Sequence, residues 1–278
     1  MAHCVVPEAE ALLDKEFTVL DNGFVRLVDY LGGDARIVQA ARVSYGDGTK
    51  SVSQDAALID YLLRHEHTSP FEQVQLTFHL KMPIFVARQW VRHRTARMNE
   101  VSGRYSIMRE EFYVPAEEHI APQSADNKQG RSDEPFSHDA AAAIQTAITD
   151  GQRAAYNSYA ALIDTGVARE LARINLPLSL YTELYWQIDL HNLFHFLKLR
   201  LDSHAQYEIR AYAAVVLDIT RAVAPVAVQS FENHVQHGVL FSGEEMDALR
   251  KVLAGADNPL TGKKRERFTE KIQTGKQL

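Results

Sequence analysis

The sequence predicts a mixed α/β fold: a single domain with an antiparallel or mixed central sheet flanked by long helices, and not a Rossmann fold. Residues 17–28 indicate a β-hairpin, because the turn sequence Asp21-Asn22-Gly23 separates two apolar runs. Residues 73–81 alternate between apolar and polar side chains, as a half-buried strand does. No Gly-x-Gly-x-x-Gly pattern occurs, which argues against the phosphate-binding turn of a Rossmann fold.

The first half of the chain continues with alternating elements. Residues 34–45 and 53–65 carry apolar side chains at helical spacing. A third helix is expected over residues 84–94, since a proline stands where that helix can begin. The polar residues 95–103 predict a loop, and residues 105–114 predict a strand.

The second half of the chain is predominantly helical. Residues 115–136 are acidic and contain Pro and Gly, which predicts a loop and a candidate lid. Residues 137–165 predict a long Ala-rich helix with Ser137 as its N-cap. The elements expected after it are a short helix ending near Ile174, a strand over residues 178–187, and helices over residues 189–201 and 203–223. From Gly262 the tail is basic and polar and is expected to be mobile.

Composition restricts the function classes. Hydrophobic residues make up 46% and charged residues 24% of the chain, which is typical of a globular protein and excludes a collagen-like or wholly disordered one. Cys4 is the only cysteine, so neither an internal disulfide nor a cysteine-based zinc site is expected. The acidic N-terminus lacks an apolar signal segment, and no apolar run is long enough to cross a bilayer. We therefore expect a cytoplasmic protein without a membrane partner.

Positive charge is concentrated in one short segment. Residues 88–104 hold five arginines and one acid, although the chain as a whole has a formal net charge of −6. A compact arginine cluster on an acidic body favours one small anion, and no nucleic-acid partner is expected. Ser102-Gly103-Arg104 offers such an anion a hydroxyl, a free backbone and a guanidinium, and Trp90 and Tyr105 flank it with aromatic surface. For any single arginine, capping of the preceding helix is the simpler interpretation.

Two other function classes stay open on the residues alone. An arginine-rich RNA-binding protein would stack bases on Trp90 and Tyr105. A histidine-dependent metallohydrolase would use His65-Glu66-His67 and the i, i+4 pair His191 and His195, but no third ligand is evident and no metal site is expected. Neither a Gly-x-x-x-x-Gly-Lys phosphate loop nor a Gly-x-Ser-x-Gly nucleophile motif occurs.

The segment from Arg92 to Ser102 reads Arg-His-Arg, seven residues, then Ser, and it resembles the signature of the flavin-dependent thymidylate synthase family. Flanking motifs extend the resemblance from about residue 41 to residue 210. They are residues 67–72 (HTSPFE), 83–90 (PIFVARQW), 99–106 (NEVSGRYS), 176–182 (LPLSLYT) and 199–206 (LRLDSHAQ). We therefore expect a catalytic domain over residues 1–225 and a C-terminal extension over residues 226–278, partly helical with the mobile basic tail.

The resemblance implies an activity. The family methylates dUMP to dTMP, with methylenetetrahydrofolate as the carbon donor, FAD as the hydride carrier and NADPH as the reductant. The resemblance also implies a homotetramer whose sites are shared between subunits. The sequence itself supports a flavin-dependent activity on one point. A cysteine-dependent thymidylate synthase needs a thiolate in a site that lowers the pKa of its thiol, whereas Cys4 lies outside every motif. A flavin hydride is the available substitute.

The same resemblance assigns site residues by motif position. Arg200 is the catalytic residue, since a guanidinium near the pyrimidine stabilises negative charge that builds on the ring. A salt bridge from Arg200 to Asp202 or Glu208 is the alternative. The dUMP residues are Gln89, Trp90, Val91, Arg92, Glu100, Val101, Ser102, Gly103, Arg104, Arg173 and Arg200. The FAD residues are Ser69, Arg92, His93, Arg94, Glu100, Asp189, Leu190, His191 and His195.

Some positions depart from the family pattern or stay open. Asp189 and His191 stand where other members have Asn and Arg, and an ionised Asp cannot donate a hydrogen bond. Ser44 and His67 are further candidates near the site, and a structural role for His67 in the turn that follows it is an equal alternative. Glu72 is a candidate for burial opposite an arginine.

Overall fold

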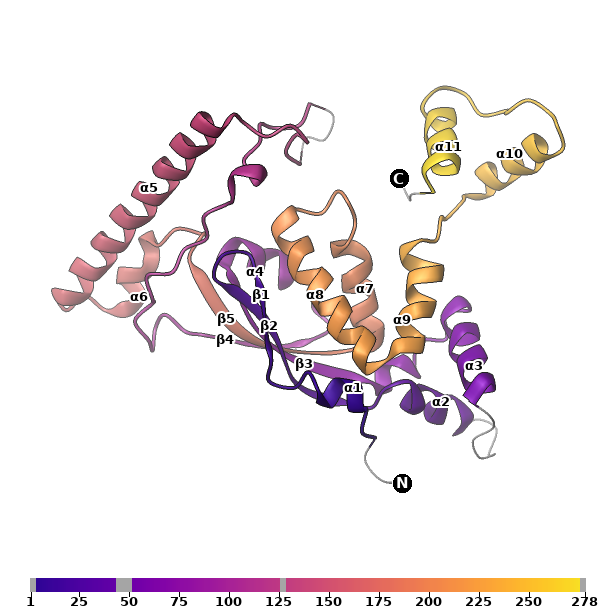
Figure 1. Cartoon of the computed structure of the whole chain (residues 1–278), viewed down its shortest axis with the longest axis horizontal. Coiled ribbons are helices and arrows are strands. Elements are labelled where there is room, and N and C mark those ends of the chain that lie inside the picture. Colours follow the sequence, from indigo (N-terminus) through magenta and orange to yellow (C-terminus); the bar gives the residue numbers. More distant parts are fainter. Residues whose placement is uncertain (1–3, 44–51, 126–128, 276–278) are drawn as a thin grey trace. The chain divides into compact units, whose positions relative to one another are not determined.

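The computed structural model describes residues 4–43, 52–125 and 129–275. The chain forms two compact units, and Figure 1 follows it through both. The first unit comprises Met1–Thr49 and Thr68–Ala224, and the second comprises Lys50–His67 and Pro225–Leu278. The second unit thus groups a short early segment with the C-terminal part of the chain. No linker-like stretch in the sequence indicates this grouping.

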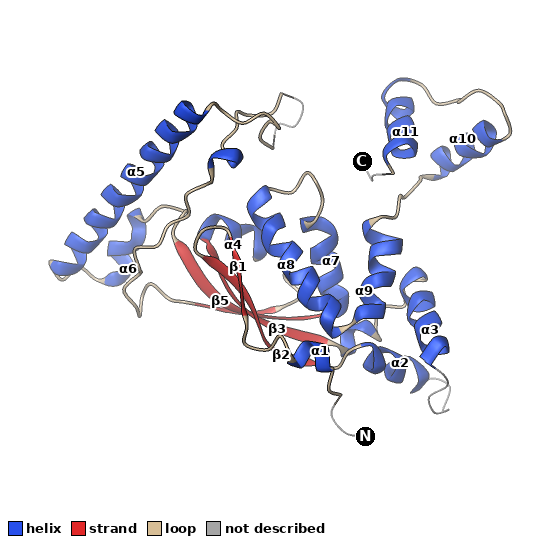
Figure 2. Ribbon diagram, viewed as in Figure 1, coloured by secondary structure: helices blue, strands red, loops and turns tan. Residues whose placement is uncertain are grey.

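A five-stranded antiparallel sheet forms the centre of the first unit (Figure 2). The strand order is β1-β2-β3-β5-β4. The strands are β1 (Glu16–Val19), β2 (Gly23–Leu31), β3 (Gln75–Pro83), β4 (Arg97–Glu100) and β5 (Tyr181–Asp189). β1 and β2 form the predicted hairpin, where Gly23 is required because a Cβ atom would lie 1.8 Å from the Tyr212 hydroxyl. The predicted mixed α/β fold with an antiparallel central sheet is confirmed.

The two faces of the sheet differ, as the alternation in β3 predicts. The apolar side chains of β3, including Phe78, are fully buried. The helices on this face are α4 (Ile84–Trp90), α7 (Leu190–Arg200) and α8 (Tyr207–Val223). The opposite face carries polar and aromatic side chains, with the rings of His79 and Tyr185 stacked at 4.8 Å. Removal of apolar surface from water between sheet and helices stabilises this layer.

The first unit contains further helices, α1 (Pro7–Glu10), α2 (Asp34–Arg42), α5 (His138–Asp164) and α6 (Arg169–Ala172). Its short helical turns are Phe71–Gln73, Glu117–His119 and Arg173–Asn175. Helix α5 confirms the predicted Ala-rich helix, although Ser137 at its N-cap makes no side-chain capping bond within the described part of the chain. A small apolar cluster that includes Met108, Tyr159 and Ala172 holds α5 and α6 against the segment before β5.

Three expectations around the arginine-rich segment are wrong. Helix α4 ends at Trp90 and not at residue 94. The expected loop contains strand β4, which pairs with β5. Residues 105–114, expected as a strand, are irregular apart from an isolated bridge between Phe112 and Leu180. β4 is an edge strand whose side chains are mostly exposed, so it has no apolar alternation by which its sequence could reveal it.

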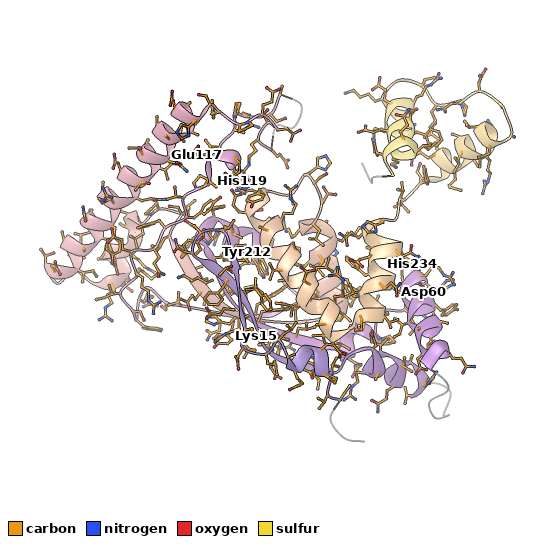
Figure 3. The ribbon with its side chains drawn as sticks, in the orientation of Figure 1. Lys15, Asp60, Glu117, His119, Tyr212 and His234 are labelled. Atoms are coloured by element: carbon orange, nitrogen blue, oxygen red, sulfur yellow. The ribbon has the colours of Figure 1, made fainter. Side chains whose placement is uncertain are left out.

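The second unit is helical within its described residues. Its helices are α3 (Val52–Arg64), α9 (Pro225–Phe231), α10 (Gly243–Leu253) and α11 (Gly262–Thr274). A π-helical turn, Glu232–Gln236, follows α9. Asp60 on α3 lies 2.7 Å from Nε2 of His234 in that turn (Figure 3), and this pair ties α3 to the end of α9.

The C-terminal segment that was expected to be a mobile tail forms helix α11. Phe268 is buried in a small cluster with Ala248 and Leu260. Lys271 is also buried, and its Nζ lies 2.9 Å from Oε2 of Glu245 on α10. These two contacts anchor α11 although most of its side chains are polar. Across the described ranges, no helix is long and apolar enough to cross a membrane.

Candidate active site

A cavity of about 280 Å³ lies between the end of α4 and one face of α7 in the first unit. Its polar lining includes Arg92, His93, Arg94, Asn192, His195 and Arg200. The buried ring of Trp90 positions this site, because it packs 4.4 Å from the Phe196 ring and thereby holds the end of α4 against α7. The structure therefore brings the predicted Arg-His-Arg segment together with His195 and Arg200.

Arg200 is held by two hydrogen bonds inside this cavity. Its Nε donates to Nε2 of His93 at 3.0 Å, and its Nη2 donates to the Gln89 carbonyl oxygen at 3.3 Å. The alternative salt bridge is wrong, since Asp202 instead binds His204 and Glu208 binds Arg131. Arg200 thus keeps a fixed orientation, and among the described residues no carboxylate neutralises it. Burial lowers the pKa of its guanidinium from the ordinary value.

His93 is a neutral hydrogen-bond acceptor in this arrangement. Burial, and then the charges of Arg200 and His195, lower the pKa of His93 to about 4. Because Nε2 accepts from Arg200, the hydrogen-bond network assigns the ring proton to Nδ1. The positive charge of the cavity at neutral pH therefore comes from arginines and not from this imidazole.

A second cluster of predicted residues lies at the end of β4. Oε1 of Glu100 accepts a hydrogen bond from Oγ1 of Thr182 at 2.6 Å. The Val101 backbone N–H then donates to the Glu183 carbonyl oxygen at 2.9 Å, which continues the pairing with β5 for one more residue. Pairing between β4 and β5 therefore sets the position of the loop that follows.

Residues 102–104 form the turn that was predicted to hold an anion. The Ser102 Oγ accepts from the Arg104 backbone N–H at 3.2 Å. A Cβ atom on Gly103 would lie 2.9 Å from Cδ of Arg173, so the absence of a side chain there lets Arg173 approach the turn. Arg104 pairs with Glu170 at 3.1 Å, and because both side chains are more than half exposed, this pair is weak and exchangeable.

The two clusters lie at opposite ends of β5. Val101 bonds to Glu183 near the start of the strand, whereas Ile188 near its end lines the cavity of Arg200. At roughly 3.3 Å per residue, these positions are on the order of 16 Å apart along the strand. The structure does not unite the two halves of the predicted dUMP site within one chain.

The predicted flavin residues of the β5–α7 junction have local roles as well. Asp189 caps α7, accepting from the Asn192 backbone N–H at 2.9 Å and from its Nδ2 at 2.8 Å. The Leu190 side chain is fully buried, so only its backbone can reach a ligand. Ser69 does not line the cavity of Arg200; it lines another of about 370 Å³, together with Arg36 and Gln73.

Other expectations need correction. The Trp90 ring is fully buried and cannot present aromatic surface to a ligand, whereas Tyr105 is 77% exposed. Glu72 is exposed and accepts from Thr68 Oγ1 instead of facing an arginine. His67 belongs to the second unit, where its ring packs edge-on against Tyr61 at 5.8 Å. Ser44 lies outside the described residues.

Sequence reasoning missed Asn192 and Gln206. Asn192 lines the cavity of Arg200, and the Asp-x-x-Asn spacing from a helix N-cap could have indicated it. Gln206 accepts from Nε2 of Gln89 at 2.6 Å across the fold, and no local pattern could reveal a partner so far away in the chain. Within the described ranges, no three His, Cys, Asp or Glu side chains gather as a metal site.

Comparisons with known proteins identify the family of this chain. Residues 26–226 match the family described as "Thymidylate synthase complementing protein", and residues 239–278 match "Thymidylate synthase ThyX C-terminal domain". The second match covers the region in which no motif had been recognised.

Several relatives cover nearly the whole chain. A flavin-dependent thymidylate synthase of Treponema denticola is 63% identical over 96% of this chain and 100% of its own length. One of Thermus thermophilus is 57% identical over 84% of this chain and 85% of its own length. The crystal structure of a UMP/dUMP methylase from Streptomyces cacaoi bound with 5-Br dUMP superposes with a TM-score of 0.72 at 33% identity, over 79% of this chain and 99% of that one. The chain belongs to the flavin-dependent thymidylate synthase family.

Proposed function

We propose that this chain methylates dUMP to dTMP, taking the carbon from methylenetetrahydrofolate and the reducing equivalents from NADPH through FAD. The observation that carries the proposal is the cavity in which a neutral His93 and the Gln89 carbonyl aim the Arg200 guanidinium. A guanidinium held in this way is ready to stabilise negative charge on a pyrimidine. The alternatives of an RNA-binding protein and a metallohydrolase have no comparable support.

The residues around the cavity fit a flavin. Arg92 and Arg94 are exposed cations suited to the diphosphate, and the half-buried His93 and the exposed His195 offer imidazole edges to a ring system. We infer that these residues hold FAD together with Ser69, Glu100, Asp189, Leu190 and His191. When bound, FAD would supply the hydride for the reductive step, and no cysteine thiolate is needed at the site.

The dUMP is held by both clusters. Ser102, Gly103, Arg104 and Arg173 bind the phosphate, and the weak Arg104–Glu170 pair opens to release its guanidinium. Gln89 and Arg200 face the pyrimidine, while Trp90, Val91, Arg92, Glu100 and Val101 complete the site. Trp90 contributes its backbone alone.

The separation of these clusters along β5 supports a site completed by a second copy of the chain. In a symmetric oligomer, the Ser102 turn of one subunit can meet the Arg200 cavity of another. We propose that the enzyme is a homotetramer with shared sites, that it acts in the cytoplasm, and that its folate approaches this same shared site.

A reconstituted assay tests the function. The FAD-loaded chain is supplied with dUMP, methylenetetrahydrofolate and NADPH, and dTMP is measured by chromatography. We expect product that disappears when FAD, the folate or NADPH is omitted and that persists in Cys4→Ser. Loss of activity in a folded Cys4→Ser variant, or turnover that is independent of FAD, would overturn the proposal.

A further inference from the structure

Asn192 is a polar side chain of the Arg200 cavity to which the family motifs assign no role. It lies in the first turn of α7, three residues before His195, and both side chains line the cavity. Residues three or four positions apart lie on the same face of a helix. The wall that α7 contributes to this cavity therefore holds an amide next to the imidazole of His195.

The Asp189 carboxylate fixes the orientation of this amide. Nδ2 of Asn192 lies 3.0 Å from Oδ1 and 2.8 Å from Oδ2 of Asp189, and the Asn192 backbone N–H donates to Oδ1 at 2.9 Å. Turning the amide by 180° would place its oxygen against the carboxylate, where two acceptors would repel each other. The amide nitrogen therefore faces Asp189, and Oδ1 of Asn192 is directed away from it.

The cavity offers a ligand one acceptor and one set of donors. In the described part of the chain, the side-chain hydrogen bonds of Asn192 all run from Nδ2 to Asp189, so its Oδ1 can still accept. Arg200 uses Nε to bind His93 and Nη2 to bind the Gln89 carbonyl, which leaves the N–H bonds of Nη1. The fixed acceptor and the fixed guanidinium line the same cavity.

A ring imide is the chemical group that matches this pair. An imide presents one N–H donor between two carbonyl oxygens, so its N–H can meet Oδ1 of Asn192 while a carbonyl oxygen meets the guanidinium of Arg200. A carboxylate has no donor for Asn192. An amine brings a second positive charge to Arg200, which is unfavourable.

We propose that Asn192 accepts the N3–H of a ring imide in the Arg200 cavity, and that Asp189 is the positioning residue that directs its oxygen. Asp189 stands where other members of the family have Asn, and a carboxylate cannot donate a hydrogen bond to a ligand. In this chain Asp189 contributes to the site through Asn192, which presents the acceptor.

Two molecules of the proposed reaction carry such an imide, the isoalloxazine ring of FAD and the uracil ring of dUMP. The flavin is favoured, because Asn192 shares the cavity with His195 and with the Arg-His-Arg segment, which the proposed function assigns to FAD. This choice of ring rests on the proposed function. The match to an imide rests on the hydrogen bonds of Asn192 and Arg200.

Equilibrium binding of FAD and of 3-methyl-FAD to the full-length chain, freed of flavin, tests the proposal. Methylation removes the N3 donor, so wild type should bind 3-methyl-FAD about tenfold more weakly than FAD. Asn192→Ala removes the acceptor and should weaken FAD about tenfold while changing 3-methyl-FAD by less than about twofold, so that the preference disappears. Asn157→Ala, at an exposed position of α5, is the matched control and should keep the preference.

Asp189→Ala tests the positioning role. It leaves the Asn192 acceptor in place but lets the amide turn, so the preference for FAD over 3-methyl-FAD should fall to about threefold. A purely structural role of Asp189 would weaken both flavins equally and leave the preference unchanged. Thermal unfolding checks that each variant is folded, and Asn192→Leu replaces Asn192→Ala if that variant is not.

A second pair of probes identifies the ring. The FAD-loaded chain is titrated with dUMP and with 3-methyl-dUMP, and if only the preference for dUMP depends on Asn192, the imide is that of uracil. If neither preference depends on Asn192, the inference is overturned. The reconstituted assay is run separately on wild type. Formation of dTMP without any effect of Asn192 on binding would refute the inference alone, whereas an effect on binding without dTMP would refute the proposed function alone.

Discussion

Arg200 is the side chain on which the proposed chemistry depends most directly. Arg200→Ala should abolish dTMP formation while FAD stays bound, because loss of an aligned cation costs on the order of 3 kcal/mol or more of transition-state stabilisation. Arg200→Lys should not rescue activity, since a point charge cannot bond His93 and the Gln89 carbonyl together as the guanidinium does. Turnover and flavin absorbance of the purified variants are the measurements. Normal turnover in either variant would contradict the assignment.

His93 makes stability depend on pH. Its pKa is lowered to about 4 in the folded chain, so between about pH 6.5 and pH 4 the unfolded chain binds the extra proton. Stability should therefore fall as the pH falls through that window. His93→Gln should flatten the fall, measured as the urea midpoint against pH, while His237→Gln at an exposed position should leave it unchanged. An identical slope in wild type and His93→Gln would show that His93 does not titrate in this way.

For single residues, the sequence predicts the chemical role of a side chain better than it predicts whether that side chain is buried. The Arg-His-Arg segment identifies the cavity with His195 and Arg200, because the motif residues are themselves the lining. Trp90 is misinterpreted as an aromatic surface, since its position next to the motif does not show that its side chain points into the core. The pairing of Glu208 with Arg131 joins residues far apart in sequence and could not be predicted.

Among the elements, those with a buried face were predictable. β3 and α8 have apolar patterns of the correct period, and the structure contains both. β4 has no such pattern and is held through its pairing with β5, which only the folded chain shows. Helix α11 was not predicted because most of its side chains are basic or polar. Its buried residues are Phe268 and Lys271, which is too few to give an apolar pattern.

The ion pairs between α10 and α11 offer a matched comparison at the scale of elements. Lys271 and Glu245 are 5% and 13% exposed, whereas Lys264 and Glu244 are 67% and 58% exposed. Lys271→Ala leaves a buried carboxylate without its partner and should lower the stability of these two helices by about 3 kcal/mol. Lys264→Ala should cost less than about 1 kcal/mol. Amide hydrogen exchange in α10 and α11 measures both, and equal effects would contradict the anchoring role of Lys271.

For the molecule as a whole, shared sites can be tested by mixing two inactive variants. Arg104→Ala damages the turn at the end of β4, and Arg200→Ala damages the cavity beside α7. If each site takes one half from each of two subunits, co-expression of the variants should restore about a quarter of the wild-type sites. The activity of the purified mixed oligomer is the measurement. No recovery above either single variant would mean that one chain supplies both halves.

The division into two units is the part of the architecture that could not be predicted from the sequence. The segment Lys50–His67 lies far from the C-terminal helices in sequence, yet α3 is tied to the end of α9 through Asp60 and His234. A boundary near residue 225 could be expected from the point where the motifs end. The inclusion of α3 could not, because a helix with one apolar stripe does not show which partner covers it.

The burial of both tryptophans allows the intrinsic fluorescence of this protein to report on cofactor binding. Trp90 and Trp186 are the only two tryptophans, they are fully buried, and their ring centroids lie 5.0 Å apart. An indole shielded from water emits at shorter wavelengths, in the range where a flavin absorbs. Because Trp90 is two residues from Arg92 in the cavity wall, energy transfer should quench this emission when FAD binds and restore it when FAD leaves. Fluorescence of the unlabelled enzyme can therefore follow cofactor loading in real time, and a red shift would mark unfolding instead.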